Sequence, residues 1–189
     1  MKRSIFWLYS LVLILLGTAC SSRYTFSTDY KQGINFREYK TFSVIDYYKF
    51  KADVDPVLNS DINKARISDK LTNEFEQRGY QCVESSKNPD ILVKFRTDVQ
   101  TRQEFVQTNN MNNWGWYGWR YDPFPMVTTQ EQIYDEMNFV IDVVDTNNNK
   151  TVWQGWAFKK LGKKREKVGE ALTKIIDEML VEYPVSVND

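Results

Sequence analysis

Two long runs of alternating side chains constrain the fold of this chain more than any other feature of its sequence. From Ile91 to Val99 every second residue is apolar or threonine, and from Lys94 onward the residues between them are charged. The second run places its apolar residues at Ile133, Met137, Phe139, Ile141 and Val143, with Asp135 as the exception. A period of two is typical of a strand with one buried face. The two runs therefore predict two long strands of a sheet that is covered on one side.

Turn residues and shorter runs complete the predicted sheet. The triplet Asn147-Asn148-Asn149 predicts a hairpin turn, because asparagine tolerates left-handed backbone angles, and a returning strand follows over residues 151–159. Shorter strands are predicted over residues 21–30, 41–46 and 80–84.

Two helices are predicted beside these strands. Asn59 or Ser60 can cap the first helix and Gly79 ends it, and we expect one face to carry the apolar residues Leu58, Ile62, Leu71 and Phe75. The second helix ends before Pro184, and its apolar stripe consists of Val168, Ala171, Leu172, Ile175, Ile176, Met179 and Leu180. The predicted fold class is α+β, a two-layer sandwich of a mainly antiparallel sheet with two helices packed on one face.

The first residues have the pattern of an export signal. A basic start, Met1-Lys2-Arg3, precedes a weakly polar and apolar run from Ile5 to Leu16, which is shorter than the ~20 residues of a membrane-spanning helix and typical of a signal-peptide core. The following Leu16-Gly17-Thr18-Ala19-Cys20 resembles the lipobox of bacterial lipoproteins, although Gly17 stands where leucine is usual. We expect residues 1–19 to be a lipoprotein signal peptide, Cys20 to carry the lipid, and residues 20–189 to form one α+β lipoprotein domain. Plain secretion with cleavage near Ala19 is the alternative.

Charge and cysteine content exclude several classes of protein. The chain has 25 basic and 25 acidic residues, whereas a nucleic-acid binder carries a strongly basic face, so we expect no nucleic-acid partner. Cys82 is the only cysteine besides Cys20, which rules out a disulfide within a lipidated chain. Its apolar neighbour Val83 favours a buried thiol.

The residue types needed for common catalytic sites are missing. The chain has no histidine, which excludes Ser-His-Asp and His-zinc sites. Glu136 and Asp142 share one face of a predicted strand, but about 20 Å would separate them, too far for a catalytic pair of carboxylates. We therefore expect no enzyme activity, no metal and no cofactor.

A Gly/aromatic loop over residues 110–127 is the first candidate binding feature. Its aromatic residues include Trp114, Trp116, Tyr117, Trp119 and Tyr121. Exposed rings here would suit sugar stacking, a protein contact or the membrane interface. Alternatively, the rings fold back over the sheet and belong to the core.

A basic cluster before the last helix is the second candidate feature. It contains Lys159, Lys160, Lys163, Lys164 and Arg165, although cations at a helix start oppose the helix macrodipole. Anionic lipid headgroups or an acidic partner would account for it. A solvated turn is the alternative.

Several short motifs, taken in order, resemble one bacterial lipoprotein family, known as domain of unknown function 4136. They are residues 35–42 (NFREYKTF), 78–80 (RGY), 88–93 (NPDILV), the Gly/aromatic loop, 152–155 (VWQG) and 182–184 (EYP). The resemblance covers nearly the whole chain after Cys20. It implies a lipoprotein of the Gram-negative envelope and no established activity.

These observations favour a lipid-anchored envelope lipoprotein that acts as a non-enzymatic binding or assembly-accessory module. We expect it to be held at the outer membrane facing the periplasm. Its expected partners are the membrane, through the lipid anchor, and an envelope protein or a glycan. The alternative is a glycan- or peptidoglycan-binding module that uses the Trp-rich loop.

Overall fold

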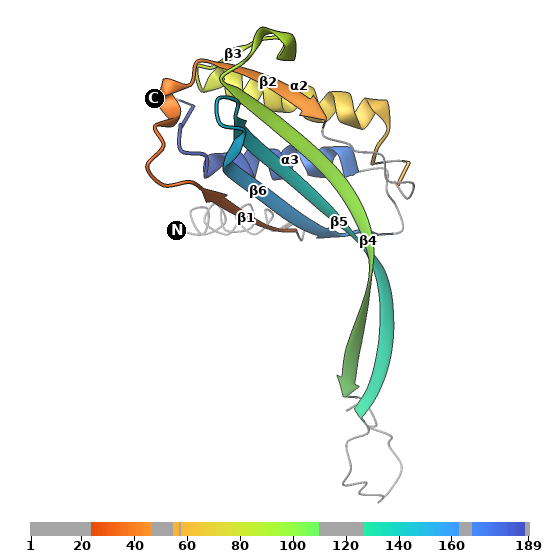
Figure 1. Ribbon diagram of the computed structural model, residues 1–189. Helices are drawn as coiled ribbons and strands as arrows, with labels where there is room; N and C mark the ends of the chain where they lie inside the picture. The colour runs from red at the N-terminus through yellow and green to blue at the C-terminus, as the bar shows by residue number, and fades with distance from the viewer. Residues whose placement is uncertain (1–23, 47–54, 57, 110–126, 163–167, 188–189) are drawn as a thin grey trace, which may run out of the picture.

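The computed structural model describes residues 24–46, 55–56, 58–109, 127–162 and 168–187. This part of the chain forms two layers, a six-stranded sheet and a layer of two helices on one of its faces (Figure 1). The strands are β1 (Thr25–Tyr30), β2 (Thr41–Asp46), β3 (Gln81–Cys82), β4 (Ile91–Asn109), β5 (Val127–Asp145) and β6 (Lys150–Lys160). The helices are α2 (Asp61–Gln77) and α3 (Val168–Val181), with short 3-10 turns η1 (Phe36–Glu38) and η2 (Ser85–Lys87). The α+β fold class predicted from the sequence is confirmed.

The sheet is mixed, with the order β1-β6-β5-β4-β2-β3. Strands β1, β6, β5 and β4 pair antiparallel, whereas β2 pairs parallel with both β3 and β4. Parallel neighbours need a crossover connection, and α2 lies between β2 and β3 in the chain. The parallel edge therefore explains where the first helix lies.

The core fills the space between the sheet and the helices. Ile91, Val93 and Phe95 on β4 are buried, as are Met137, Phe139, Ile141 and Val143 on β5. From the helix layer, α3 contributes Leu172, Ile175, Ile176 and Met179, all with 0% exposure. The apolar faces of β4 and β5, formed by every second residue, thus pack against the apolar stripe of α3, as the sequence predicted.

Helix α2 begins as predicted, and the predicted apolar face is buried at Leu58, Leu71 and Phe75, with one exception. The Ser60 hydroxyl accepts the backbone N–H of Asn63 at 3.3 Å, and Gly79 just after the helix has φ +87°. The prediction that Ile62 lies on the buried face is wrong, because its side chain is 72% exposed. Nine residues separate it from Leu71, and nine steps of about 100° place two residues on opposite sides of a helix. Ile67 takes the expected place in the core.

Strand β3 corrects a second expectation. The strand predicted over residues 80–84 is only Gln81–Cys82, paired with the start of β2 at the edge of the sheet. Because β3 lies at the edge of the sheet, Cys82 is exposed rather than buried, although Glu76 of α2 lies near its thiol. Tyr80, one residue earlier, is the side chain that reaches the core.

Candidate functional site: a projecting ribbon and the hollow at its base

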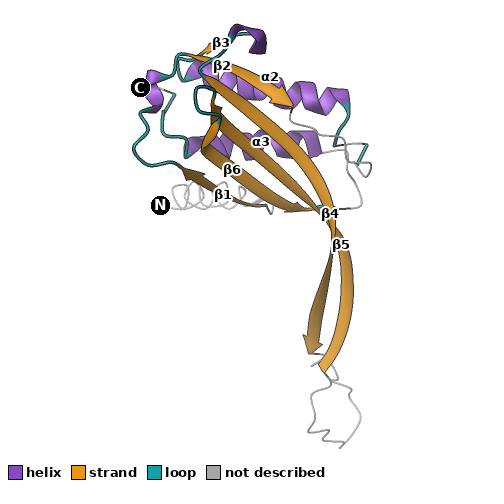
Figure 2. Ribbon diagram, in the orientation of Figure 1, coloured by secondary structure: helices purple, strands orange, loops and turns teal. Residues whose placement is uncertain are grey.

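Strands β4 and β5 continue beyond the rest of the sheet as a two-stranded ribbon (Figure 2). They pair without interruption from Ile91 opposite Asp145 to Asn109 opposite Val127. Strand β2 pairs with β4 only as far as Phe95, and β6 pairs with β5 only as far as Glu136. We define the ribbon as residues 101–109 and 127–135. In the described part of the chain, neither outer edge of this ribbon pairs with a third strand, although at its base the Asp135 carbonyl accepts the backbone N–H of Leu161 at 2.8 Å.

Side-chain contacts across the strands hold the base of the ribbon. The Thr101 hydroxyl donates to Asp135 at 3.0 Å, and Arg102 Nε donates to Glu136 at 3.1 Å. The first pair is directly opposed and the second is diagonal in the register, and both kinds of cross-strand contact stabilise a sheet. An isolated two-stranded hairpin is marginal in water, so the ribbon depends on being continuous with the two central strands of the domain.

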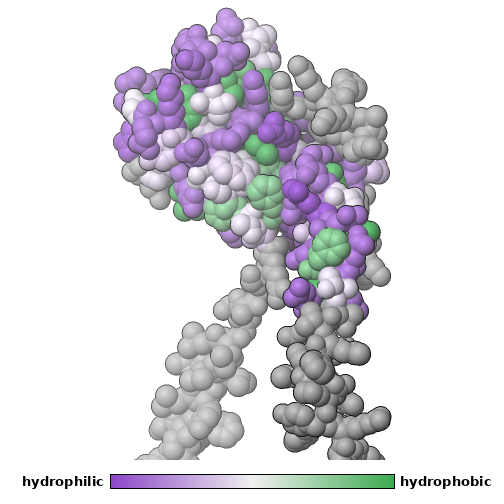
Figure 3. All heavy atoms as spheres, turned by 60° about the horizontal axis from the view of Figure 1, so that its bottom comes forward, coloured by the Kyte–Doolittle hydropathy of each residue, from purple (hydrophilic) through white to green (hydrophobic). Residues whose placement is uncertain are grey.

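One face of the ribbon exposes apolar side chains. Phe105 is 66% exposed and Ile133 is 60% exposed, and in the register they stand on the same face as the buried residue Met137. The sequence placed Ile133 on the buried face of this strand. It does share that face, but the prediction that it is buried is wrong, because the ribbon has passed beyond the helices. The space-filling view shows small hydrophobic patches among hydrophilic residues on both the domain and the ribbon (Figure 3).

A hollow of about 450 Å³ opens to solvent where the ribbon leaves the domain. Most of its lining residues occupy strand positions that face away from the helices. They are Tyr24, Thr25, Glu104, Tyr134, Glu136, Phe158 and Lys160. The hollow therefore combines three aromatic rings with charged groups, and it belongs to the face of the sheet that the helices leave uncovered.

The charged groups of the hollow hold one another in place. Lys160 Nζ lies 3.7 Å from the centre of the Tyr134 ring and 3.5 Å from Glu104 Oε2. The Glu136 carboxylate is held by Arg102. A cation over an aromatic face is attracted by the ring quadrupole, so Lys160, Tyr134 and Glu104 form one connected group.

Of the binding residues predicted from the sequence, the structure places two. Lys160 lies in the hollow, and Lys159 Nζ lies 5.7 Å from the centre of the Tyr24 ring on β1. The lipidation residue Cys20, the cations Lys163, Lys164 and Arg165, and the loop aromatics Trp114, Trp116, Tyr117, Trp119 and Tyr121 lie outside the described residues. The ribbon and its hollow were not predicted. The signal was present in Phe105 and Val106, which prolong the first strand toward the loop.

The acidic residues considered from the sequence make structural contacts. Asp142 accepts a hydrogen bond from the Gln154 amide on β6, and Glu136 pairs with Arg102. Among the residues that the structure describes, no three acidic, cysteine or histidine side chains are grouped so that they could hold a metal ion. Within the same residues, no helix has the length and hydropathy needed to cross a membrane.

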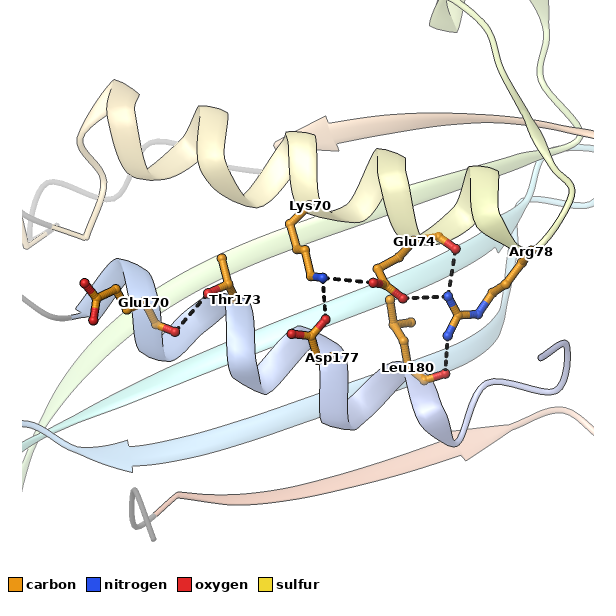
Figure 4. Close-up of polar contacts among 7 residues, drawn as sticks. All are labelled: Lys70, Glu74, Arg78, Glu170, Thr173, Asp177 and Leu180. Atoms are coloured by element: carbon orange, nitrogen blue, oxygen red, sulfur yellow. Dashed lines mark hydrogen bonds and ion pairs between the residues drawn. The ribbon is translucent and has the colours of Figure 1, made fainter. Parts of the chain in front are cut away.

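A buried polar cluster joins the two helices (Figure 4). Arg78 Nη1 donates to Glu74 Oε2 and to the Glu74 carbonyl, each at 2.7 Å, and Arg78 Nη2 donates to the Leu180 carbonyl of α3 at 2.7 Å. Lys70 bridges Glu74 to Asp177 of α3. Burial alone would raise the pKa of Glu74, but hydrogen bonds from Arg78 and Lys70 outweigh it and lower that pKa. The cluster is nearly buried at Arg78 and Glu74 and reaches solvent at Asp177, and it acts as a clamp between the helices.

Two further carboxylates hold loops in place through hydrogen bonds. Asp90 accepts the backbone N–H groups of Lys40 and Thr41 at 2.7 and 2.9 Å, and the first of these bonds contributes most to lowering its pKa. Asp145 accepts the Tyr39 hydroxyl at 3.1 Å, and burial together with this bond raises the pKa of Tyr39 to about 12. Asp90, Lys40 and Thr41 all belong to the motifs of the family resemblance, which therefore reflect loop architecture.

Comparison of the sequence with known families supports that resemblance. A family model described as Domain of unknown function (DUF4136) matches residues 26–185. None of the curated proteins matches the sequence.

One solved structure shares the fold of this chain, and two others are similar to it at lower scores. A PDZ domain protein from Parabacteroides distasonis is similar with a TM-score of 0.55 and 15% identity, over 97% of this chain and 40% of that one. This chain thus spans about 40% of the length of that protein. A DUF4136 family protein from Bacteroides thetaiotaomicron has a TM-score of 0.46 and 14% identity, over 84% of this chain and 96% of that one. A PelC dodecamer chain from Paraburkholderia phytofirmans has a TM-score of 0.46 and 12% identity, over 84% and 95%. At these identities the likeness concerns the fold alone.

Proposed function

The chain belongs to the DUF4136 family, and from that premise and the geometry of the ribbon we propose that it is a lipid-anchored, non-enzymatic binding module of the cell envelope. In this proposal Cys20 carries the lipid, the domain faces the periplasm from the outer membrane, and the ribbon binds an envelope protein. The projection of the ribbon from the domain is the observation that carries the proposal.

The surface of the ribbon has the properties of a protein-binding element. Its two outer edges offer backbone N–H and C=O groups to an additional strand, the mode known as β-augmentation. On one face, Phe105 and Ile133 keep large apolar side chains in water at 66% and 60% exposure. A few large side chains that become fully buried at the centre of an interface contribute most of its binding free energy. Phe105, an exposed ring on this face, is the expected anchor.

The polar groups near the ribbon favour binding over catalysis. Glu104 and Glu136 are each engaged by a cation, Lys160 and Arg102 respectively. Carboxylates held by cations in this way present oriented hydrogen-bond acceptors to a ligand. The non-enzymatic proposal rests on this arrangement and on the absence of histidine from the sequence.

A cross-linked pull-down from the native envelope tests the proposal. The lipidated protein would be compared with the double variant Phe105→Ser/Ile133→Ser and with a form whose residues 112–125 are replaced by a Gly/Ser linker. The matched control is Ile62→Ser/Val181→Ser, which removes two helix residues of 72% and 80% exposure. We expect a specific protein to be recovered by the native form and the control and lost from the ribbon variant. Equal recovery by all forms, or recovery of nothing by the native form, would refute the role of the ribbon.

The lipid anchor has its own test. Metabolic labelling with an alkyne-tagged fatty acid should mark the native protein and leave Cys20→Ser unmarked. Labelling of neither form would argue for plain secretion with cleavage near Ala19, and labelling of both forms would mean that the lipid is attached to a residue other than Cys20.

A further inference from the structure

The aromatic and charged side chains that line the hollow at the base of the ribbon take no part in the proposed binding of a protein partner. We propose that it is a binding site for a neutral saccharide, with Phe158 as the stacking platform. This proposal is independent of the ribbon's protein partner, because it concerns the face of the sheet opposite to that of Phe105 and Ile133.

A row of two aromatic rings lies along β6. Phe158 is 36% exposed, and Trp156, two residues earlier on the same strand, is half-buried on the same face. Two residues of strand separate the two side chains by about 7 Å. Because both rings are carried by a strand that is paired on both sides, they form a fixed surface rather than a mobile one. An aromatic ring offers a flat apolar face, which matches the C–H face of a pyranose.

Polar groups lie around that aromatic surface. Thr25 stands directly opposite Phe158 in the register of β1 and β6. The carboxylates of Glu104 and Glu136 line the same hollow and are oriented by Lys160 and Arg102. Hydrogen bonds to ionised groups are stronger than neutral ones. A ring that stacks on Phe158 would thus find a hydroxyl and two oriented carboxylates at its edge.

The balance of charge selects the class of ligand. Each carboxylate of the hollow has a cation beside it, so neither an anion nor a cation of the ligand would find an uncompensated opposite charge. A purely apolar ligand would have to desolvate those charged groups, which is costly. A neutral molecule with one apolar face and many hydroxyls needs no opposite charge, and its hydroxyls can hydrogen-bond to the charged groups. The volume of about 450 Å³ lies within the range of small-molecule sites, and the open side leaves room for a chain of sugars to continue.

Calorimetric titration of the full chain tests the site. The protein would be purified in a detergent without a sugar headgroup and titrated with two β-1,4-linked tetrasaccharides, one of N-acetylglucosamine and one of glucose. We expect at least one of them to bind. Phe158→Ala should weaken that binding at least tenfold, while Phe158→Tyr, which keeps the ring, should bind as the native protein does.

A matched control removes an aromatic ring from the other end of the same strand pair. Tyr30 is 44% exposed and lies opposite Trp153, far from the hollow, so Tyr30→Ala should leave the affinity unchanged. The proposal is overturned if neither tetrasaccharide binds, if Phe158→Ala binds normally, or if Tyr30→Ala weakens binding equally. It is also overturned if binding is lost only when residues 112–125 are replaced, because the Trp-rich loop is then the sugar site. Phe158→Ala should still recover the protein partner, which separates the two proposals.

Discussion

Arg78 joins the two helices at a buried position, and replacing it with methionine should lower the free energy of unfolding by about 3 kcal/mol. The guanidinium side chain is 4% exposed. It donates to the Glu74 carboxylate, the Glu74 carbonyl and the Leu180 carbonyl. Methionine can fill the space of the Arg78 stem, so the loss is chiefly that of the charged hydrogen bonds.

The expected loss of unfolding free energy depends on the contacts that the partners of Arg78 keep in the variant. Removing one member of a buried ion pair typically costs about 3–5 kcal/mol because the other charge is left uncompensated. Here Glu74 keeps the ammonium of Lys70 at 2.9 Å, and the Leu180 carbonyl keeps the Tyr183 N–H at 3.2 Å. The Nε of Arg78 is itself buried without a hydrogen-bond partner among the described residues, so its removal offsets part of the loss. These contacts place the expectation at the lower end of the range.

Urea unfolding of the chain from Ser21 onward, followed by tryptophan fluorescence, measures the effect. Trp153 has 0% exposure and reports on the core. The control is Arg102→Met, which breaks an ion pair whose side chains are 50% and 20% exposed and should cost no more than about 1 kcal/mol. A loss in Arg78→Met as small as in Arg102→Met would refute the view that burial makes the helix clamp strong. The slope of unfolding free energy against urea should be unchanged in both variants.

A double-mutant cycle separates the pair from its surroundings. Glu74→Met/Arg78→Met removes both charges together, and it should be less destabilising than the sum of the two single variants, because neither single charge is then left buried alone. Strict additivity would mean that Glu74 and Arg78 do not stabilise each other.

Three further predictions concern acid, the exposed thiol and a close contact in the core. The pKa of Glu74 is lowered in the folded state, so its stabilising effect is complete above the ordinary carboxyl pKa of about 4.3 and is lost as pH falls toward the folded value. In Glu74→Gln, the free energy of unfolding measured in urea should fall less steeply between neutral and acidic pH. The same fall with pH as in the native protein would contradict this role of Glu74. Cys82 is exposed and should react with a maleimide in the native protein, at a rate that rises with pH because the thiolate is the nucleophile. Partial burial and the nearby Glu76 carboxylate raise the pKa of the Cys82 thiol, so the rise should come at higher pH than for an unperturbed thiol. Labelling that requires denaturant would contradict its place on the edge strand. Gly155→Ala would place a Cβ 2.7 Å from Cη2 of Trp153 and against the end of Met179. The overpacking should lower the free energy of unfolding by about 1–3 kcal/mol. A thermal midpoint equal to that of the native protein would contradict this prediction and show that the core relaxes freely.

The sequence alone determined the elements and the class of the fold. Alternation in the two long runs specified strands, the 3.6-residue stripe on residues 168–180 specified a helix, and the asparagine triplet specified a hairpin whose Asn149 has φ +53°. These are local properties, since the period of the apolar residues and the backbone preference of a turn residue are read within one segment. The motifs of the family resemblance could be recognised for the same reason, because each is a short local segment, such as the one that places Asp90 in a loop.

The tertiary structure decided what local patterns leave open. Ile133 and Met137 have the same pattern and share a face, yet only Met137 is buried, because burial depends on where α2 and α3 end above the sheet. Cys82 is exposed because β3 lies at an edge, a fact set by the order of the strands and not by Val83 beside it. The hollow, too, exists only after β1, β5 and β6 are aligned, since its lining residues are scattered from Tyr24 to Lys160. Sequence specifies which face of each element is apolar, whereas the packing of the elements decides which of those faces meets water.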